Sequence, residues 1–248
     1  MHPALIKIGP LTIHTYGALV AAGFLLGIAL AVRQAKRQGV PHERIADLAF
    51  YIVISAILGS RLLYVLMNLS YYADRPLDAL KVWEGGLVFY GGLILAGAVG
   101  IRYIKRKGLA LYETVDIFAP SLAIGHAVGR LGCFSAGCCY GSPTDVPWAV
   151  TFTDPEALAP LGIEIHPTQL YESGGEFLIF LVLIGLRKRG PRAGTLFFGY
   201  LLGYSALRFF TEFLRGDLPK VAGISSTQAL SIVLFLVAVV MLLRLRRP

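Results

Sequence analysis

Charged residues are scarce in this 248-residue sequence. Only 15% of the residues are Asp, Glu, Lys or Arg, whereas 56% are hydrophobic and the mean hydropathy is +0.66. Ordinary soluble domains carry more charge, so the composition excludes that class. The sequence also lacks a low-complexity segment and a strong internal repeat. Long hydrophobic runs fill much of its length, and they indicate one polytopic membrane domain over residues 1–248.

The N-terminal segment, MHPALIKIGPLTIHTYG, lacks the pattern of a secretory signal peptide. It has no basic region followed by an apolar core and a small-residue cleavage site. We therefore expect the chain to be held in the membrane by its own helices.

The hydrophobic runs predict an all-α polytopic membrane protein with seven transmembrane helices. The fourth run is shorter than the others. The predicted spans are residues 16–32, 48–69, 87–104, 115–128, 170–186, 194–214 and 227–243. Residues 140–167 carry five prolines and cannot span. We expect them to form a small external, periplasmic-side subdomain, and residues 71–86 to form another outer loop.

Basic residues follow the first, third, fifth and seventh spans. With alternating topology these four ends share one side of the membrane, and an excess of Lys and Arg marks that side as cytoplasmic. The pattern predicts an external N-terminus, a cytoplasmic C-terminus and a bacterial plasma (inner) membrane location. The net charge of +8 is then explained by the Lys and Arg residues that set the orientation in the membrane, and no nucleic-acid partner is expected. The clusters are Arg33, Lys36, Arg37 and Arg44; Arg102, Lys105, Arg106 and Lys107; Arg187, Lys188, Arg189 and Arg192; and Arg244, Arg246 and Arg247.

Polar side chains recur at or within the outer halves of six predicted spans. Ionisable groups in a membrane are costly, so their convergence at one depth predicts a functional site. They are Tyr16, Arg61, Tyr90, His126, Arg130, His166, Gln169, Tyr171, Glu172, Tyr204, Arg208 and Glu212.

The spacing of these groups indicates what the site binds. Tyr204, Arg208 and Glu212 lie at i, i+4 and i+8 and share one helix face, and His126 and Arg130 lie at i and i+4. The planar guanidinium fork matches phosphate. Because membrane phosphates belong to lipids, the residues predict a lipid-phosphate site at the outer leaflet.

Structural roles are the alternatives for the arginines. Arg61 can pair with a carboxylate and fix helix packing. Arg130 can snorkel to the outer interface, and Arg208 can form a purely structural pair with Glu212. Glycine-rich helix interfaces also occur in membrane bundles that carry out no chemistry.

The three cysteines, Cys133, Cys138 and Cys139, all fall in one outer segment. Their number is odd, so they cannot all pair within one chain. One interpretation is a disulfide from Cys133 to Cys138 or Cys139. A second is a metal site with His126 or His166, although C-x4-C-C lacks the usual zinc spacing. A third is a nucleophilic thiol. We favour a structural or disulfide role.

Several motifs together resemble one known family. GRLGCFSAGCCYG at residues 129–141 is similar to the G-R-x-G-N-F-x-N-G signature of the bacterial prolipoprotein diacylglyceryl transferases. The other matches follow in the family's order and cover nearly the whole chain. They are TYG at 15–17, GSRLLY at 59–64, WEGGLVFYGGLI at 83–94, HPTQLYE at 166–172 and GYSALRFFTEFLRGD at 203–217. The family's seven spans and external N-terminus agree with the predicted topology.

The resemblance implies a transferase of lipoprotein biosynthesis. Such an enzyme moves the sn-1,2-diacylglyceryl group from phosphatidylglycerol to the lipobox cysteine thiol of a prolipoprotein signal peptide and releases glycerol-1-phosphate. No cofactor and no metal are expected, and the chain is taken as a monomer. By motif, Arg130 and Arg208 match phosphate binders, and developing phosphate charge needs such cations. Tyr16, Tyr204, Glu212 and Arg215 match binding or positioning residues, and Arg61 is a further substrate-binding candidate.

The sequence departs from the family pattern at two places. Many members have His, proposed as the base, where this chain has Tyr90, and tyrosine is a poor base near neutral pH. In the signature, Cys133 and Ala136 replace two asparagines, and Cys138 replaces a residue that is often acidic. We propose His126 or His166 as the substitute base, with thiol activation by arginine electrostatics alone as the alternative.

These departures motivate a second enzyme hypothesis, a paralogue with another lipid donor or acceptor. A transporter or flippase also carries polar groups at midplane, but no broken-helix pair or repeat supports it. A structural scaffold would not require the convergence of polar groups.

Overall fold

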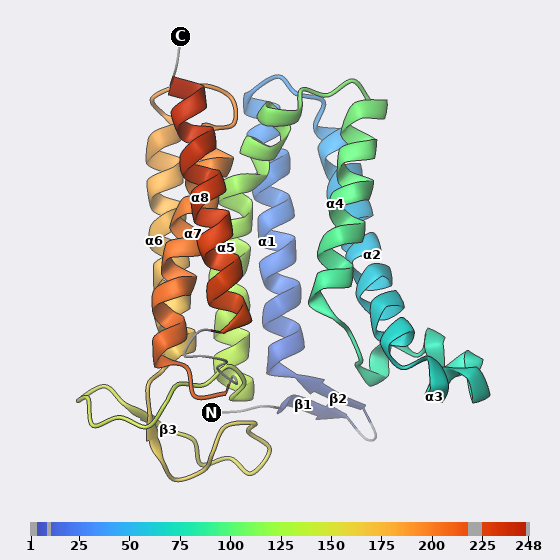
Figure 1. Ribbon diagram of the computed structural model, residues 1–248, viewed down its shortest axis with the longest axis vertical. Coiled ribbons are helices and arrows are strands. Elements are labelled where there is room, and N and C mark those ends of the chain that lie inside the picture. Colours follow the sequence, from blue (N-terminus) through green and yellow to red (C-terminus); the bar gives the residue numbers. More distant parts are fainter. Residues whose placement is uncertain (1–3, 9–10, 218–224, 247–248) are drawn as a thin grey trace. The chain divides into compact units, whose positions relative to one another are not determined.

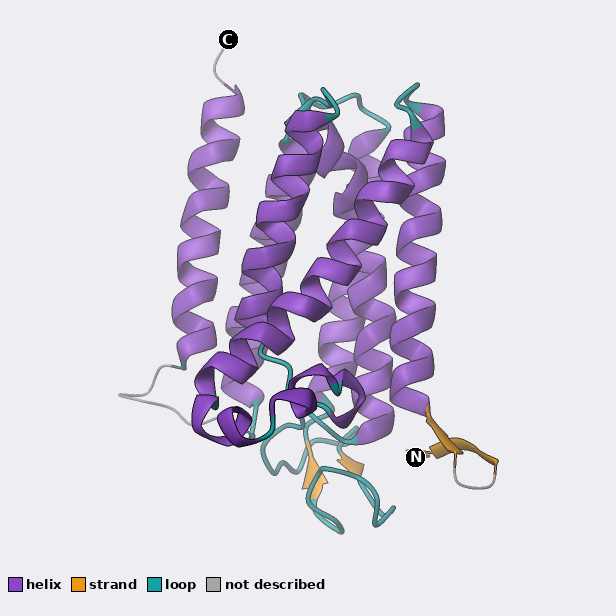
Figure 2. Cartoon of the chain, turned by 90° about the vertical axis from the view of Figure 1, so that its right-hand side faces the viewer, coloured by secondary structure: helices purple, strands orange, loops and turns teal. Residues whose placement is uncertain are grey.

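The computed structural model describes residues 4–8, 11–217 and 225–246, and most of these residues are helical (Figures 1 and 2). The main helices are α1 (Thr15–Arg37), α2 (His42–Met67), α4 (Phe89–Arg106), α5 (Leu111–Ala136), α6 (Thr168–Arg187), α7 (Thr195–Thr211) and α8 (Ser226–Arg246). Short helices are α3 (Leu69–Asp74), η1 (Pro76–Leu80), η2 (Val82–Glu84) and η3 (Glu212–Leu214). The strands form two antiparallel pairs, β1 (Ala4–Ile8) with β2 (Leu11–His14) and β3 (Val150–Thr151) with β4 (Glu164–Ile165).

Five helices, α1, α2, α5, α6 and α8, are long and apolar enough to cross a membrane by length and composition. The predicted membrane character is therefore supported. The helices α4 and α7 are shorter, with 18 and 17 residues. The sequence predicted a short fourth span at residues 115–128. That length is wrong for the helix, because α5 has 26 residues and extends beyond the predicted run at both ends.

The chain divides into two compact units. One comprises Met1–Leu30 and Val115–Pro248, and the other comprises Ala31–Thr114. The first unit contains β1, β2, most of α1, nearly all of α5 and the helices α6, α7 and α8. The second contains α2, α3 and α4.

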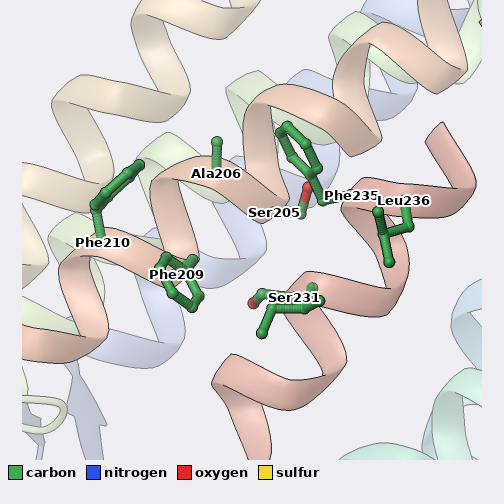
Figure 3. Close-up of a pocket in the computed structure, with 8 residues that line it drawn as sticks. Ser205, Ala206, Phe209, Phe210, Ser231, Phe235 and Leu236 are labelled. Carbon is green, nitrogen blue, oxygen red and sulfur yellow. The ribbon is translucent and has the colours of Figure 1, made fainter. Parts of the chain in front are cut away.

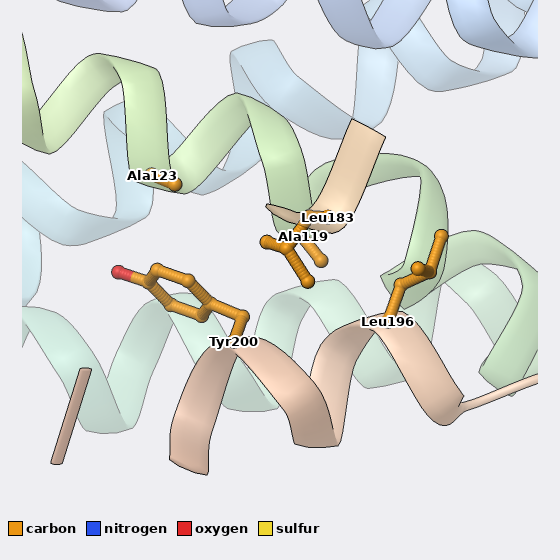
Figure 4. Packing of buried hydrophobic residues seen from close by; sticks show 5 residues of the cluster. All are labelled: Ala119, Ala123, Leu183, Leu196 and Tyr200. Carbon is orange, nitrogen blue, oxygen red and sulfur yellow. The ribbon is translucent and has the colours of Figure 1, made fainter. Parts of the chain in front are cut away.

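The core of the first unit lies between α5, α6 and α7 (Figure 4). Ala119 and Ala123 of α5 meet Leu183 of α6 and Leu196 and Tyr200 of α7, and all five are buried. The two alanines leave room for the larger side chains of the neighbouring helices, so the three backbones approach closely.

The helices α1 and α5 approach even more closely. A Cβ atom on Gly23 would lie 2.8 Å from the carbonyl oxygen of Gly125, so a side chain at this position would force the helices apart. This contact brings the start of α1 close to the last turns of α5.

Pro120 lies inside α5 without leaving a carbonyl unpaired. Proline has no N–H for the carbonyl of residue i−4, which here is Asp116. Arg187 of α6 donates to that freed carbonyl. The Asp116 side chain accepts the backbone N–H groups of Gly194 and Phe197, both at 2.7 Å, and so caps the start of α7. One buried residue therefore joins three helices.

The second unit is built on the contact of α2 with α4. Gly59 and Gly91 face each other, and a Cβ atom on either would overlap the carbonyl oxygen of the other. The WEGGLVFYGGLI motif thus supplies helix packing at Gly91.

The basic clusters meet in pairs within each unit. Arg44 donates to the carbonyl of Lys107 at 3.0 Å in the second unit, and Arg192 donates to the carbonyl of Leu245 at 2.7 Å in the first. In each unit, ends that the positive-inside rule assigns to one side therefore lie together. Arg247 lies outside the described residues.

Residues 140–167 are mostly loop with a small hydrophobic core of their own. Phe152, Ala159 and Ile165 are buried there, and Phe134 of α5 packs against them. The backbone N–H of Ser142 donates to the carbonyl of Leu214 at 2.8 Å, which fixes the segment to the end of η3.

Candidate functional site

Glu172, in the first turns of α6, is the centre of a buried ion cluster in the first unit. Its Oε2 atom lies 2.5 Å from Nη2 of Arg130 on α5, and its Oε1 atom lies 2.7 Å from Nη1 of Arg208 on α7. Nη1 of Arg215 lies 4.0 Å from the same Oε1 atom. Three arginines from different segments therefore face one carboxylate.

Two further carboxylates complete the cluster. Oε2 of Glu212 lies 2.7 Å from Nη2 of Arg208, one helical turn away, and the Ser225 hydroxyl donates to the other oxygen of Glu212 at 2.5 Å. Asp217 pairs with Arg215 through two hydrogen bonds. Three guanidinium groups thus match three carboxylates, which offsets most of the cost of burying the charges.

Arg130 is the most accessible arginine of this cluster. Its side chain is 21% exposed, compared with 7% for Arg208 and 5% for Arg215. Its Nη1 atom has only a weak contact, 4.0 Å from Sγ of Cys133. Arg208, in contrast, uses both terminal nitrogens on carboxylates. An incoming anion would therefore reach Arg130 first.

His126 lies one turn before Arg130 on α5. Its Nδ1 atom is 3.3 Å from Oε1 of the buried Glu176 and 3.0 Å from the hydroxyl of Tyr200. Its ring lies 5.5 Å from the ring of Tyr204. Among the described residues, Nε2 of His126 has no hydrogen-bond partner, and the side chain is 49% exposed. A histidine held at one nitrogen and open at the other can accept a proton.

Two other predicted residues, Tyr16 and His166, also belong to the first unit. Tyr16, at the start of α1, packs beside Gly132 of α5, and its side chain is exposed. Nδ1 of His166 lies 3.3 Å from the hydroxyl of Tyr171, which also accepts a hydrogen bond from Trp148 at 2.7 Å. His166, at the end of the 140–167 segment, thus contacts the first turns of α6.

Arg61 and Tyr90 belong to the second unit. Within the described residues, Arg61 donates only to backbone carbonyls, those of Asp78, Ala79, Gly85 and Gly86, at 2.5 to 3.4 Å. One alternative drawn from the sequence was that Arg61 pairs with a carboxylate. In the structure, backbone carbonyls take the place of that carboxylate. Tyr90 is exposed in the first turn of α4, against the ring of Phe89. The site roles of both residues stay predictions.

The three cysteines gather at the end of α5. Their sulfur atoms lie within 4.8 Å of one another, and all three are free thiols. Gly137 and Cys139 have positive φ angles of 74° and 61°, which turn the chain back on the helix end. Hydrogen bonds from Cys133 and Cys138, together with the positive charges of Arg215 and Arg130, lower the pKa of the Cys139 thiol.

An apolar pocket of about 250 Å³ lies between α7 and α8 (Figure 3). Phe209, Phe210 and Phe235 contribute to its lining. Two serines also line it, but the hydroxyl of Ser205 donates to the carbonyl of Leu201, and that of Ser231 donates to the carbonyl of Thr227. The pocket therefore presents a hydrocarbon surface.

The central place of Glu172 and the contact of Glu176 with His126 were not among the predicted site roles. Glu172 was recognised only as one polar group opening a span. Its signal was the i, i+4 spacing of two acidic residues in YESGGE at 171–176, which places both carboxylates on one face of α6.

Comparison with known proteins identifies the family of this arrangement. The family model described as prolipoprotein diacylglyceryl transferase matches residues 3–244. The chain belongs to the prolipoprotein diacylglyceryl transferase family. It is 41% identical over 239 residues to the phosphatidylglycerol–prolipoprotein diacylglyceryl transferase of Synechococcus elongatus, covering 93% of this chain and 83% of the relative. The proteins of the same name from Clostridium tetani and Bacillus cereus are each 36% identical, covering 96% and 98% of this chain and 96% and 91% of the relatives.

The resemblance drawn from the motifs is thereby confirmed. The motifs GRLGCFSAGCCYG, HPTQLYE and GYSALRFFTEFLRGD supply Arg130, Glu172, and Arg208 with Glu212 and Arg215. The diacylglyceryl transferase motifs that are far apart in sequence thus meet in the ion cluster around Glu172.

Proposed function

We propose that this chain transfers the sn-1,2-diacylglyceryl group from phosphatidylglycerol to the lipobox cysteine of a prolipoprotein, the first step of bacterial lipoprotein maturation. The thiolate attacks the glyceryl carbon that carries the phosphodiester. A carbon–sulfur bond forms, the carbon–oxygen bond to phosphate breaks, and glycerol-1-phosphate leaves. The thiol proton passes to a base, so the charges balance.

The proposal rests mainly on the guanidinium of Arg130. It is partly exposed, whereas the other arginines of the cluster are buried against carboxylates. A phosphodiester that leaves from carbon gains negative charge, which a cation held in a poorly hydrated site stabilises strongly. Arg130 has one terminal nitrogen on Glu172, and the other has only a 4.0 Å contact with Sγ of Cys133, which an anion can replace.

Arg208 and Arg215 support Arg130 indirectly. They hold Glu172 in place through Oε1, and Glu212 fixes Arg208 in turn. Arg208 also reaches the phosphate if Glu172 shifts toward Arg130 when lipid binds. Tyr16 and Tyr204 position the substrate from the start of α1 and the middle of α7.

His126 is the proposed base for the acceptor thiol. Glu176 and Tyr200 hold its Nδ1 atom, which leaves Nε2 to take the proton. His166 is the less favoured candidate, because its ring nitrogen contacts Tyr171, which is engaged by Trp148.

We further propose that the whole chain forms one seven-span membrane domain and acts as a monomer. In this proposal α4 and α7 also cross the bilayer, the N-terminus and residues 140–167 lie outside, and the C-terminus is cytoplasmic. Within each unit, basic ends that the positive-inside rule assigns to one side lie together, at Arg44–Lys107 and at Arg192–Leu245, which supports the proposed topology of each unit. Reporter fusions after Thr144 and after Arg246 would give opposite locations if this topology is right.

The test of function uses purified protein in phosphatidylglycerol liposomes with a lipobox peptide. The expected result is a diacylglyceryl mass increase on the Cys peptide only, with one glycerol phosphate released for each peptide modified. A matched Cys→Ser peptide and liposomes without phosphatidylglycerol serve as controls. No mass increase, with folded protein and an active family member alongside, would favour a paralogue with another donor or acceptor.

A further inference from the structure

The cysteine cluster Cys133, Cys138 and Cys139 has no part in the function proposed so far. Its three sulfur atoms lie within 4.8 Å of one another, and each side chain is partly exposed. Three thiolates around one metal at the usual zinc–sulfur distance are about 4 Å apart. The cluster therefore needs only a small contraction to enclose an ion.

The backbone around the cysteines is fixed from outside the cluster. Thr168 donates to the carbonyl of Cys139 at 2.8 Å, and Gln169 donates to the carbonyl of Cys138 at 2.8 Å. Both donors are at most 1% exposed in the first turn of α6. Such support from surrounding residues holds ligands in a binding arrangement before an ion arrives.

The charges nearby suit a thiolate-bound cation. Three thiolates around a divalent ion carry one net negative charge, and guanidinium groups close by offset it. Nη1 of Arg130 lies 4.0 Å from Sγ of Cys133, and the charge of Arg215 acts on Cys139. The metal would thus lie directly beside the arginine proposed to hold the lipid phosphate.

We propose that Cys133, Cys138 and Cys139 bind a thiophilic d10 cation of the Zn(II) class, whose open fourth position takes the sulfur of the acceptor cysteine. The second part rests on the proposed function. Thiolate ligands select soft ions of this class, and a coordinated thiol loses its proton. The acceptor R–SH gives its proton to His126, binds the metal as R–S⁻, and then attacks the glyceryl carbon as glycerol-1-phosphate departs.

Metal titration tests the site independently of transfer. Cd(II) added without oxygen to the reduced full-length protein in detergent should give a thiolate-to-metal charge-transfer band that saturates at one ion per chain. Zn(II) should compete for the site. The variants Cys133→Ser, Cys138→Ser and Cys139→Ser should each lose the tight site. Ser135→Ala is the matched control, because its hydroxyl donates only to the carbonyl of Leu131 in the same helix.

Two results would overturn the metal site. One is a band that is absent or that survives in all three cysteine variants. The other is a native disulfide between any two of these cysteines, found by mass spectrometry of alkylated, non-reduced protein. The disulfide interpretation of the sequence would then be right.

Chelation tests the activating role. Protein stripped of metal, with unchanged circular dichroism, should transfer at least about tenfold more slowly, and stoichiometric Zn(II) should restore the rate. Full activity in stripped protein would overturn that role while the binding site stands. If loaded protein binds metal but transfers nothing, the proposed function and the activating role fail together, and the metal site alone remains.

Discussion

Each compact unit buries arginine in a predicted membrane span, but the two units satisfy it differently. Arg61 of the second unit is 6% exposed and donates to backbone carbonyls beyond the end of its helix, and its guanidinium lies over the rings of Tyr64 and Tyr72. In the first unit, Arg130, Arg208 and Arg215 face carboxylates.

The difference separates an anchor from a site. Backbone carbonyls cannot move away without unfolding the segment that carries them, so Arg61 holds residues 78–86 in one conformation. A carboxylate on a side chain can change partners, and an incoming phosphate can compete for the same guanidinium. We therefore expect Arg61 in the motif GSRLLY and Arg130 in the motif GRLG to serve different purposes.

Glu172→Gln should have the largest effect on the ion cluster. Glutamine keeps the shape but leaves Arg130 without its carboxylate and weakens the pairing of Arg208. Loss of one partner from a buried ion pair costs about 3–5 kcal/mol. Thermal unfolding in detergent measures this, and Glu164→Gln, at an exposed position of β4, is the control with an expected change below about 0.5 kcal/mol. Equal stability of both variants would contradict the central place of Glu172.

Arg130→Gln should lower transfer per folded molecule by about 100-fold, and the lost ion pair with Glu172 should also lower the unfolding temperature. Removal of one preorganised donor to a developing anion has this magnitude. Initial rates in phosphatidylglycerol liposomes measure it, with the exposed Arg102→Gln as the matched control. A loss of less than about threefold would mean that lipid phosphate is held elsewhere.

Arg61→Met should affect stability more than turnover. The substitution leaves several backbone carbonyls unpaired, at a cost of about 1–3 kcal/mol. Protease digestion of the 71–86 loop should accelerate, whereas transfer per folded molecule should fall by less than about fivefold. A drop as large as that of Arg130→Gln would remove the distinction between anchor and site.

His126→Ala should lower transfer by about tenfold, less than Arg130→Gln, because the arginines and the proposed metal also favour the thiolate. Glu176→Gln should show part of this loss, since it removes the charge that holds Nδ1. Rates for His166→Ala provide the comparison. If His126→Ala and His166→Ala both keep near-normal rates in folded protein, neither histidine is the base.

Much of the fold was predictable because it depends on local hydrophobic pattern. Helix positions follow the apolar runs, and basic clusters mark the ends that meet. The length of α5 was missed because Pro120 and the polar residues near its end weaken the apolar pattern. The sequence does not show that Arg187 pairs with the carbonyl that Pro120 frees.

The arginines of the ion cluster and Glu212 were predictable from the sequence, but the pairing of the arginines through Glu172 was not. The motifs predicted Arg130, Arg208 and Glu212, since polar groups in a membrane converge for a reason. The pairing through Glu172 depends on how α5, α6 and α7 pack, which no single motif encodes. The sequence indicated that Cys133 could meet Cys138 or Cys139, but the gathering of all three depends on positive φ angles at Gly137 and Cys139.

The most direct test is to locate the lipid headgroup by photocrosslinking. Phosphatidylglycerol with a photoreactive group on its terminal glycerol would be irradiated with the protein in liposomes, and the labelled peptides would be sequenced by mass spectrometry. The account predicts label in the last turns of α5 near Arg130, competed by unlabelled phosphatidylglycerol. Competable label confined to α2 or to residues 71–86 around Arg61 would contradict it.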